Sequence, residues 1–378
     1  MPARLSRPLH VLMTADAVGG VWQYALDLLG ALSRHGVTST LAMLGPPPSS
    51  EQRSAARAIP GLSLLETGLP LDWLAKQPAE ICRAGRRIEA LAETVNADLV
   101  HLNGAALAAE SRFPVPVVAT HHSCVATWWH AVCRGQPMPR AFEWQTELVA
   151  RGLHRADRAI APTHAFAAAV AGCYTLQRDL SVVHNGRAAP PVASAARIAA
   201  PAVFTAGRLW DAGKNLGVLD RAAQGLAVPV LAAGPIVGPN GSRIELRHIK
   251  ALGNLDEAAL RGHLAARPIY VSTAVYEPFG LAVLEAAQAG CALVLSDIAG
   301  FRELWDGAAM FVPPRDEAAV AAAIAELARS PVLRAELGRR ARTRSRRYGV
   351  SSMVHGTLEI YRAVLGHART RAKVGVAA

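Results

Sequence analysis

The chain has 378 residues, enough for two domains with separate hydrophobic cores, and its 51% hydrophobic content excludes a disordered protein. Lysine and arginine outnumber the acidic residues by 40 to 29, which gives a formal charge of +11. Aromatic residues are few and none interleaves with a basic stripe, so a phosphate-bearing substrate, an anionic membrane or a genomic preference for arginine explains this charge better than nucleic acid.

Other compositional features indicate a protein of the reducing cytoplasm. Charges or glycines interrupt every long apolar run, so we expect no transmembrane helix. Residues 1–8 contain arginines but no apolar stretch with a cleavage site, and the five cysteines show no metal-type spacing. We therefore expect a cytoplasmic enzyme with reduced cysteines.

The first predicted strand, residues 9–14, is followed by Gly19 and Gly20 and then by a helix that ends at Gly36. Residues 37–44 form the next predicted strand. Adjacent glycines between a strand and a helix allow the backbone to approach a ligand closely. Because the full G-x-G-x-x-G pattern is missing, a simple tight turn fits this pair of glycines equally well.

Strands are predicted at 98–102 and 115–119, and the second ends in Thr120-His121-His122-Ser123. Ligands bind beyond the carboxyl ends of strands in α/β sheets, so a histidine at this point is well placed for function. The alternative is a capping or core histidine, which is the common role for one alone. The following segment, 128–139, is predicted to be irregular, and its tryptophans would either stack on an acceptor or simply pack.

Further predicted elements complete a first parallel sheet: helices at 79–95, 140–153 and 163–173, and strands at 158–161 and 180–184. Asn185-Gly186 then precedes a linker over 187–200, which is rich in alanine and proline. A second series of strands and helices begins at Ala202. Its first loop, 207–215, carries Arg208 and Lys214 beside glycines. Two cations that reach the same oxygens suit a diphosphate, although either residue alone would be an ordinary surface charge.

A βαβ unit follows, with strands at 269–271 and 292–295 and a helix at 280–289 that Gly290 ends. Helices are predicted afterwards at 317–329, 332–347 and 348–365. The arginine-rich run 339–347 reads as a solvated helix face, with membrane contact as the alternative.

Two carboxylates mark the βαβ unit. Glu277 precedes the helix, and Glu285 lies on it, about 8 to 9 Å beyond the helix start at 1.5 Å per residue. Between them, the backbone N–H groups of Phe279, Gly280 and Leu281 open the helix and can bind a phosphate. A nucleotide-diphosphate sugar has hydroxyls at both ends and phosphates between them, so it fits this spacing. The alternative is a favourable charge at the helix start and a solvated face residue.

Glu277 and Glu285, within Y-E-P-F-G-L-A-V-L-E-A-A-Q-A-G, resemble the E-x7-E signature of retaining glycosyltransferases of family 4. The similarity continues through Ser296 and Gly300 to Glu303. Cys291-Ala292 departs from the small residue and proline that usually follow the helix glycine.

The resemblance implies an α/β protein of the GT-B fold, with two Rossmann-like parallel-sheet domains that face each other across a cleft. The first, which binds the acceptor, would comprise residues 1–190 and a returning C-terminal helix within 348–378. The second, which binds the nucleotide sugar, would comprise residues 191–347.

The resemblance also implies roles for individual residues. Glu277 would hold donor-sugar hydroxyls, and Glu285 would hold the ribose. His122, with His121 as its rival, would lie next to the donor sugar, and the Gly19-Gly20 loop would face the acceptor and the donor phosphates. Arg208 and Lys214 would neutralise the pyrophosphate, although the five residues between them are one more than is common in the family.

The implied reaction is transfer of a hexosyl group, with retention, from a donor such as UDP- or GDP-hexose to a carbohydrate, lipid-linked or small-molecule acceptor in polysaccharide biosynthesis. No metal or other cofactor is expected, and the enzyme would be cytoplasmic or peripheral at an anionic inner membrane face. One alternative is an epimerase or phosphorylase of the same fold, although no pyridoxal-lysine motif is present. The other is a non-catalytic sugar-nucleotide-binding protein, which would be expected to have lost some of Arg208, Lys214, Glu277 and Glu285.

Overall fold

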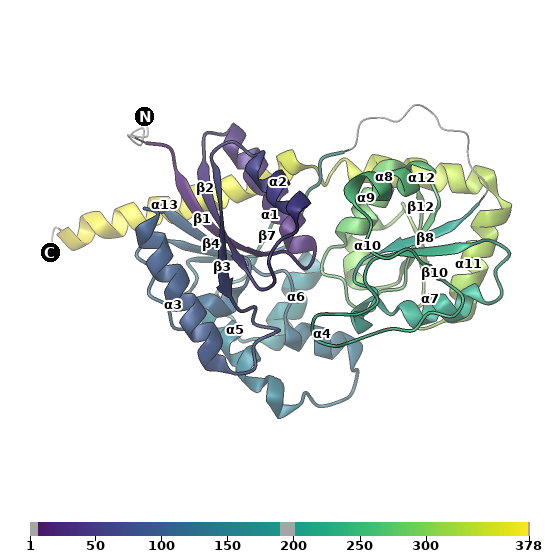
Figure 1. The fold of residues 1–378 in the computed structure, drawn as a ribbon, viewed down its shortest axis with the longest axis horizontal. Helices are drawn as coiled ribbons and strands as arrows, with labels where there is room; N and C mark the ends of the chain where they lie inside the picture. The colour runs from purple at the N-terminus through teal and green to yellow at the C-terminus, as the bar shows by residue number, and fades with distance from the viewer. Residues whose placement is uncertain (1–6, 190–200, 377–378) are drawn as a thin grey trace. The chain divides into compact units, whose positions relative to one another are not determined.

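The structure is a computed structural model that describes residues 7–189 and 201–376, except for the side chains of 369–376. The chain forms two compact units (Figure 1). The first unit comprises the chain up to Trp129, Gly135–Gly186 and the chain from Val350 onward. The second comprises His130–Arg134 and Arg187–Gly349. The predicted domain boundary between 190 and 191, and most of the predicted linker, lie outside the described residues.

The first unit contains a seven-stranded parallel sheet in the order β3-β2-β1-β4-β5-β6-β7. Chain order runs outward from β1 in one direction and from β4 in the other, so the carboxyl ends of β1 and β4 flank the switch point of a doubly wound sheet. The strands are β1 (His10–Asp16), β2 (Thr38–Leu44), β3 (Leu62–Leu69), β4 (Leu99–Leu102), β5 (Val117–Thr120), β6 (Arg158–Ala161) and β7 (Ser181–Val182).

Helices cover both faces of this sheet, as right-handed crossovers require. Alternate strand residues such as Val11 and Met13 pack against α1 (Gly20–Arg34) and against the C-terminal helix α13 (Val350–Val376), the yellow helix of Figure 1. On the other face, α3 (Pro78–Thr94) and α5 (Glu143–Arg155) pack around the short turn η1 (Ala105–Ala108). The helices α2 (Ser50–Arg57) and α6 (His164–Cys173), with the part of α4 (Val125–Val132) up to Trp129, complete the unit.

The last helix belongs to the first unit, as predicted. Met353, Val354, Leu358, Tyr361 and Val364 are all buried in the core that α1 and the β1–β2 face form. The helix continues to Val376, beyond the predicted end at 365.

Two other predictions for this unit need correction. The tryptophan-rich segment is not irregular at its start, because Val125–Val132 forms the helix α4. The predicted helix at 140–153 begins with a 3-10 turn, Arg140–Phe142, and becomes α-helical only at Glu143. The irregular part of the tryptophan-rich segment is therefore limited to the stretch between these helices.

The second unit contains a six-stranded parallel sheet in the order β10-β9-β8-β11-β12-β13. Its strands are β8 (Val203–Ala206), β9 (Val230–Ala233), β10 (Lys250–Ala251), β11 (Ile269–Ser272), β12 (Ala292–Ser296) and β13 (Met310–Val312). The helices are α7 (Leu216–Ala223), α8 (Glu257–Ala265), α9 (Leu281–Ala289), α10 (Ala299–Trp305), α11 (Glu317–Arg329) and α12 (Pro331–Ser345).

Side chains of successive strand residues point to opposite faces of this sheet, so the second unit has one hydrophobic core on each face. Val203 and Ile269 face α7 and α11, whereas Phe204 and Tyr270 face α9 and α10. Because β11 and β12 pair in parallel from Ile269 opposite Ala292, the loops after both strands open at the same edge of the sheet. The candidate site residues of this unit follow β8 and β11 at that edge.

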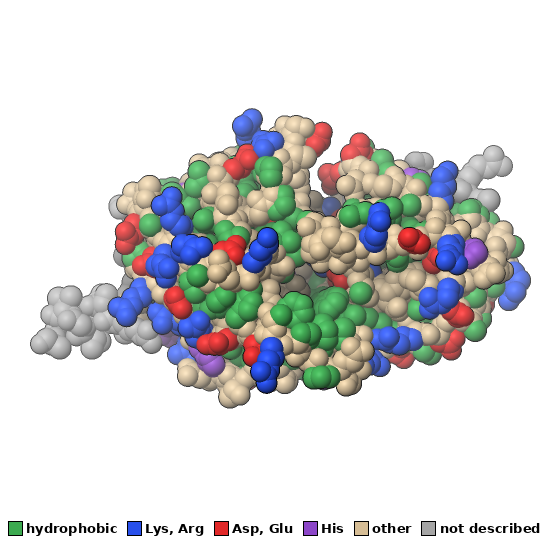
Figure 2. All heavy atoms as spheres, turned by 60° about the horizontal axis from the view of Figure 1, so that its bottom comes forward, with side chains coloured by type: hydrophobic (Ala, Val, Ile, Leu, Met, Phe, Trp, Pro, Cys, Tyr) green, Lys and Arg blue, Asp and Glu red, His purple; other side chains and the backbone are tan. Residues whose placement is uncertain are grey.

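Within the described ranges, no helix combines the length and apolar character needed to cross a membrane. The face drawn in Figure 2 carries basic side chains interspersed with acidic ones, and they do not form one continuous stripe.

Candidate functional site

In the second unit, Arg208 and Lys214 lie at opposite ends of the loop between β8 and α7, and each is paired with a carboxylate. Arg208 Nη2 lies 2.9 Å from Asp211 Oδ2, and the guanidinium lies 5.7 Å from the Trp210 ring centroid. Lys214 Nζ forms an ion pair with Glu277 Oε2. Lys214, which was predicted to bind the diphosphate, therefore contacts Glu277, which was predicted to bind the sugar.

Backbone and amide hydrogen bonds hold these two loops together. Gly213 O accepts from Val275 N at 2.9 Å, and the Asn215 amide donates to Thr273 O at 3.0 Å and to Pro314 O at 2.6 Å. Asn215 has a left-handed backbone with φ of 52°, a conformation that asparagine tolerates better than most residues. Sequence reasoning did not assign Asn215 a role, although an asparagine at a loop-to-helix junction is a recognisable signal.

The N-terminus of α9 is shaped by Gly280, which has φ of +90° and caps the helix. A Cβ atom there would lie 3.3 Å from both Glu277 Cγ and Phe301 Cε1, so glycine is favoured by space as well as by conformation. The first N–H groups of α9, beginning with Leu281, have no partner within the helix and can bind an anion. The Phe279 ring is buried against Tyr348, so this side chain packs in the core and does not bind a ligand.

Glu285 lies further along α9 and is paired with Arg187, which sequence reasoning had placed in the linker. Arg187 Nη2 lies 2.8 Å from Glu285 Oε1 and 3.6 Å from Glu257 Oε1, and the Arg187 side chain is only 10% exposed. Its backbone is fixed as well, because Arg187 O accepts from the Gln288 amide at 3.1 Å. The signal for this contact is a charged residue directly after the Asn185-Gly186 turn, but its partner is far away in the sequence.

In the first unit, His122 follows β5, and its hydrogen bond fixes its tautomer. The Asn103 amide nitrogen donates to Thr14 O at 2.7 Å, which turns Asn103 Oδ1 toward His122 Nε2 at 2.9 Å. His122 Nε2 must therefore carry the hydrogen, and Nδ1 keeps its lone pair. Burial, together with the neighbouring His101 and His121, lowers the pKa of His122 to about 3, so the ring is neutral near pH 7. Asn103 was not predicted from the sequence.

The His122 ring packs against Tyr24, which belongs to a buried network of polar side chains. The Tyr24 ring meets the His122 ring edge-on at 4.5 Å, and Tyr24 OH lies 3.3 Å from Thr120 Oγ1. Thr120 Oγ1 lies 2.7 Å from Nε2 of the buried His101, whose Nδ1 lies 2.5 Å from Tyr361 OH on α13. Tyr24 lies one turn after Gly19 and Gly20, so the network connects the glycine loop with His122.

The neighbouring His121 has a different environment. Its side chain is 2% exposed and stacks on Phe166 with ring centroids 5.7 Å apart. Neither ring nitrogen has a geometric hydrogen-bond partner among the described residues. His122 is therefore the more accessible of the two histidines at this strand end.

The predicted residues form two groups, one in each unit. Lys214, Glu277 and the start of α9 come together in the second unit, and Arg208 lies in the same loop as Lys214. Glu285, further along α9, is held separately by Arg187. Gly19, Gly20 and His122 all lie in the first unit, where Tyr24, one turn after Gly20, contacts the His122 ring. Among the described residues, no three histidine, cysteine, aspartate or glutamate side chains form a cluster able to hold a metal ion.

These features define a protein with two parallel-sheet Rossmann-like domains, and comparisons with known proteins identify its family. The family model "Glycosyltransferase Family 4" matches residues 18–187, and the model "Glycosyl transferases group 1" matches residues 200–330. Together the two models span most of the chain, which belongs to the family 4 glycosyltransferases and has the GT-B fold.

Individual relatives agree with this assignment. The chain is 33% identical over 174 residues to a phosphatidyl-myo-inositol mannosyltransferase of Mycolicibacterium smegmatis, covering 40% of this chain and 45% of the relative. The chain thus spans about half the length of the mannosyltransferases it matches. It is 28% identical to a D-inositol 3-phosphate glycosyltransferase of Saccharomonospora viridis over 95% of this chain and 92% of the relative.

A solved structure extends the likeness of fold to the whole chain. The Anabaena protein Alr3699/HepE, in complex with UDP-glucose, has a TM-score of 0.73 and 17% identity. The match covers 94% of this chain and 100% of the Anabaena chain.

Proposed function

We propose that the protein is a retaining hexosyltransferase that uses a nucleotide-diphosphate sugar such as UDP- or GDP-hexose. The observation that carries this proposal is the joint position of Lys214, Glu277 and the α9 N-terminus, with Arg208 in the same loop as Lys214. Two cations and a helix start suit a diphosphate, and a carboxylate beside them suits sugar hydroxyls. Support comes from the Anabaena relative, whose structure contains UDP-glucose.

In this proposal, donor binding exchanges partners within the site. Lys214 and Glu277 are paired with each other, and Arg208 is paired with Asp211. A diphosphate would attract Lys214 and Arg208, which would release Glu277 for hydroxyls of the donor sugar. The cations and the α9 N-terminus would then stabilise the negative charge that develops on the leaving diphosphate.

The remaining roles follow the same proposal. Glu285, oriented by Arg187, would bind the ribose, and the first unit would bind the acceptor near the Gly19-Gly20 loop. His122 would support the donor sugar through its Nδ1 lone pair or its ring, with Asn103 as the residue that positions it. A lipid-linked acceptor is among the candidates, because the M. smegmatis relative is named for phosphatidyl-myo-inositol, a lipid.

Thermal stabilisation by a set of nucleotide sugars tests the proposal. A donor at one hundred times its dissociation constant adds about 2.7 kcal/mol to the free energy of unfolding, so the correct nucleotide should give a clear rise in Tm. The Lys214→Ala variant should lose this rise, whereas Lys250→Ala, which alters an exposed lysine on β10, should keep it. If no nucleotide sugar stabilises the protein, the donor site is wrong. If donors bind but no hexosyl transfer occurs with any acceptor, the non-catalytic alternative is favoured.

We propose that the reaction needs no metal ion, because Arg208, Lys214 and the α9 N-terminus can together offset the leaving-group charge. EDTA should therefore leave kcat unchanged within about twofold at constant ionic strength. The check is an initial-rate assay with EDTA and then with added Mn²⁺ or Mg²⁺. Activity that EDTA removes and a divalent cation restores would contradict this proposal.

We also propose that the enzyme works in the cytoplasm and attaches weakly to anionic membranes through its basic surface. A formal charge of +11 provides the attraction, since each basic residue near an anionic leaflet contributes about 1 kcal/mol. Screening acts over about 10 Å at 0.1 M salt, so sedimentation with anionic vesicles should decrease from low to physiological salt. Absence of sedimentation at low salt would favour a soluble acceptor.

A further inference from the structure

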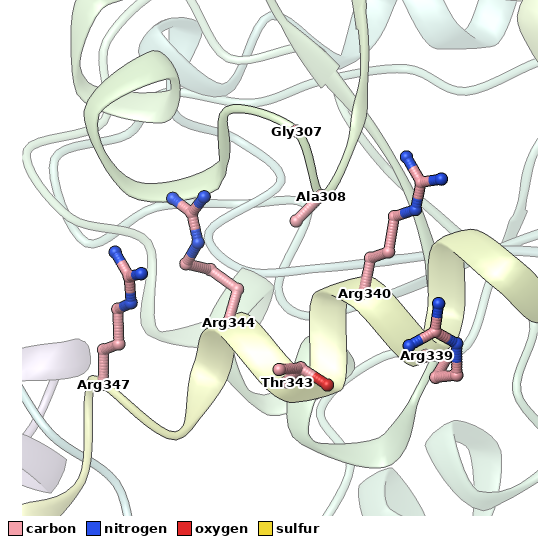
Figure 3. A pocket seen from close by; sticks show the side chains of 7 residues that line it. All are labelled: Gly307, Ala308, Arg339, Arg340, Thr343, Arg344 and Arg347. Atoms are coloured by element: carbon pink, nitrogen blue, oxygen red, sulfur yellow. The ribbon is translucent and has the colours of Figure 1, made fainter.

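The arginine-rich part of α12 lines a pocket on the second unit, separate from the candidate donor loop. The pocket has a volume of about 270 Å³ and is lined by Gly307, Ala308, Arg339, Arg340, Thr343, Arg344 and Arg347. Figure 3 shows the side chains of Arg340 and Arg344, which rise from α12, and of Arg347, in the turn after it, on the side where Gly307 and Ala308 lie. The volume is slightly below the range of about 300 to 1,000 Å³ typical of drug-sized ligands, so the pocket suits a small group.

Charge in this pocket is strongly positive. Four arginines line the pocket. Two of them, Arg339 and Arg340, share the Glu336 carboxylate at 2.8 and 2.7 Å, so one negative charge offsets part of four positive charges. The nearby Asp306 carboxylate pairs with Arg302, at 3.3 Å. Arginines four positions apart on a helix repel each other, as Arg340 and Arg344 do here. An anion bound between them would offset this repulsion.

A purely structural role accounts for only part of the cluster. Arg344 donates to Leu304 O at 3.2 Å and to Asp306 O at 2.6 Å, so it satisfies carbonyls at the end of α10. Within the described part of the chain, the exposed Arg347 guanidinium makes no ion pair or hydrogen bond. Arg339 and Arg340 are 68% and 52% exposed, and an exposed pair of this kind contributes little to folding.

We propose that this pocket is a binding site for a phosphate group, carried by a soluble phosphorylated compound or by a lipid headgroup. Guanidinium forks match phosphate oxygens in a bidentate geometry, and Arg340 on α12 and Arg347 in the turn after it supply such forks to the same pocket. The Thr343 hydroxyl at the pocket wall adds a neutral donor. This site is independent of the proposed donor site, whose cations come from the loop between β8 and α7.

The experiment titrates the full chain with inorganic phosphate at constant ionic strength and follows binding by calorimetry. An Arg208→Ala/Lys214→Ala background removes both cations of the proposed donor site, so a difference between the pocket variants in this background reports on the pocket. The Arg340→Ala/Arg347→Ala double variant should bind phosphate about tenfold more weakly or worse, as expected for lost charge-assisted hydrogen bonds. The matched control is Arg346→Ala, which removes an exposed arginine that does not line the pocket and should change affinity by less than about twofold.

A second arm identifies the source of the phosphate. Phosphatidylcholine vesicles with and without phosphatidic acid are sedimented with the same variants, and phosphate is added as competitor. Binding that needs phosphatidic acid and Arg340/Arg347 supports a headgroup, whereas phosphate binding without vesicle binding supports a soluble compound. The proposal is overturned if phosphate affinity is equal in the wild type and the double variant, if chloride at equal ionic strength competes as well as phosphate, or if neither probe binds.

Discussion

Replacing Lys214 with alanine is expected to lower kcat/KM for hexosyl transfer by at least about a hundredfold, the cost typical of removing one preorganised charge donor from a transition state. The variant loses a cation that would face the leaving diphosphate, and it leaves the Glu277 carboxylate, whose side chain is 14% exposed, without its ion-pair partner. Arg208→Ala should have an effect of the same order, because the second cation of the loop is lost. Steady-state kinetics with the donor found by thermal stabilisation measures both effects.

Two matched controls separate this effect from a general loss of positive charge. Lys250→Ala removes an exposed lysine, and Arg221→Ala removes an arginine that pairs with the exposed Glu317 in the same unit. Both should retain nearly full activity. Arg344 is a poor control, since its guanidinium holds two backbone carbonyls. Turnover close to wild type in both Lys214→Ala and Arg208→Ala would disprove the donor-site assignment.

The second large effect is expected at Glu277, with a product that keeps the anomeric configuration of the donor. Double displacement needs a nucleophilic carboxylate with an acid/base partner about 5 to 5.5 Å away. In the proposed donor complex, Glu277 holds hydroxyls of the sugar and Glu285, paired with Arg187, holds the ribose, so neither carboxylate of the motif is free to attack the anomeric carbon. This arrangement favours front-face transfer, in which the leaving diphosphate accepts the proton of the acceptor hydroxyl.

Glu277→Gln should therefore lower kcat by about a hundredfold through poorer positioning of the sugar, without trapping a covalent intermediate. Azide should not rescue Glu277→Ala, because no nucleophile has been lost. Glu317→Gln, which neutralises an exposed glutamate that also pairs with an arginine, is the matched control. Proton NMR of the fresh product and mass spectrometry of the enzyme are the measurements. An inverted linkage or a glycosylated Glu277 would contradict the mechanism.

Much of the fold could be predicted because its central strands and amphipathic helices have strong periodic patterns. The predicted strand at 158–161 and the helix at 317–329 agree with β6 and α11. The edge strand β3 was missed, since its residues alternate between partly and fully exposed and include Glu66 and Gly68, which favour a loop. The helix α4 was missed because its aromatic residues are weak helix formers and lie close to a glycine and proline segment.

The individual residues of the candidate site were predicted, but the contacts that they make with one another and with other residues were not. Lys214 and Glu277 are separated by 63 residues, and only the pairing of β8 with β11 brings their loops together. Arg187 and Asn103 act on predicted site residues from other segments, and the sequence around each gives no indication of its partner. Local patterns identify which side chains can bind a ligand, whereas the tertiary contacts decide which of them hold each other.

The position of α13 has a consequence for the order in which the protein is made. The first unit needs Met353, Leu358 and Tyr361 for its core, yet the ribosome synthesises these residues only after almost all of the second unit. At roughly 5 to 20 residues per second, the intervening stretch takes on the order of ten seconds or more to translate. During that time the core between α1 and the first sheet lacks the side chains that α13 contributes, so part of its apolar surface is exposed. A stop codon just after Gly349 would encode every candidate site residue and still leave the first unit without its last helix.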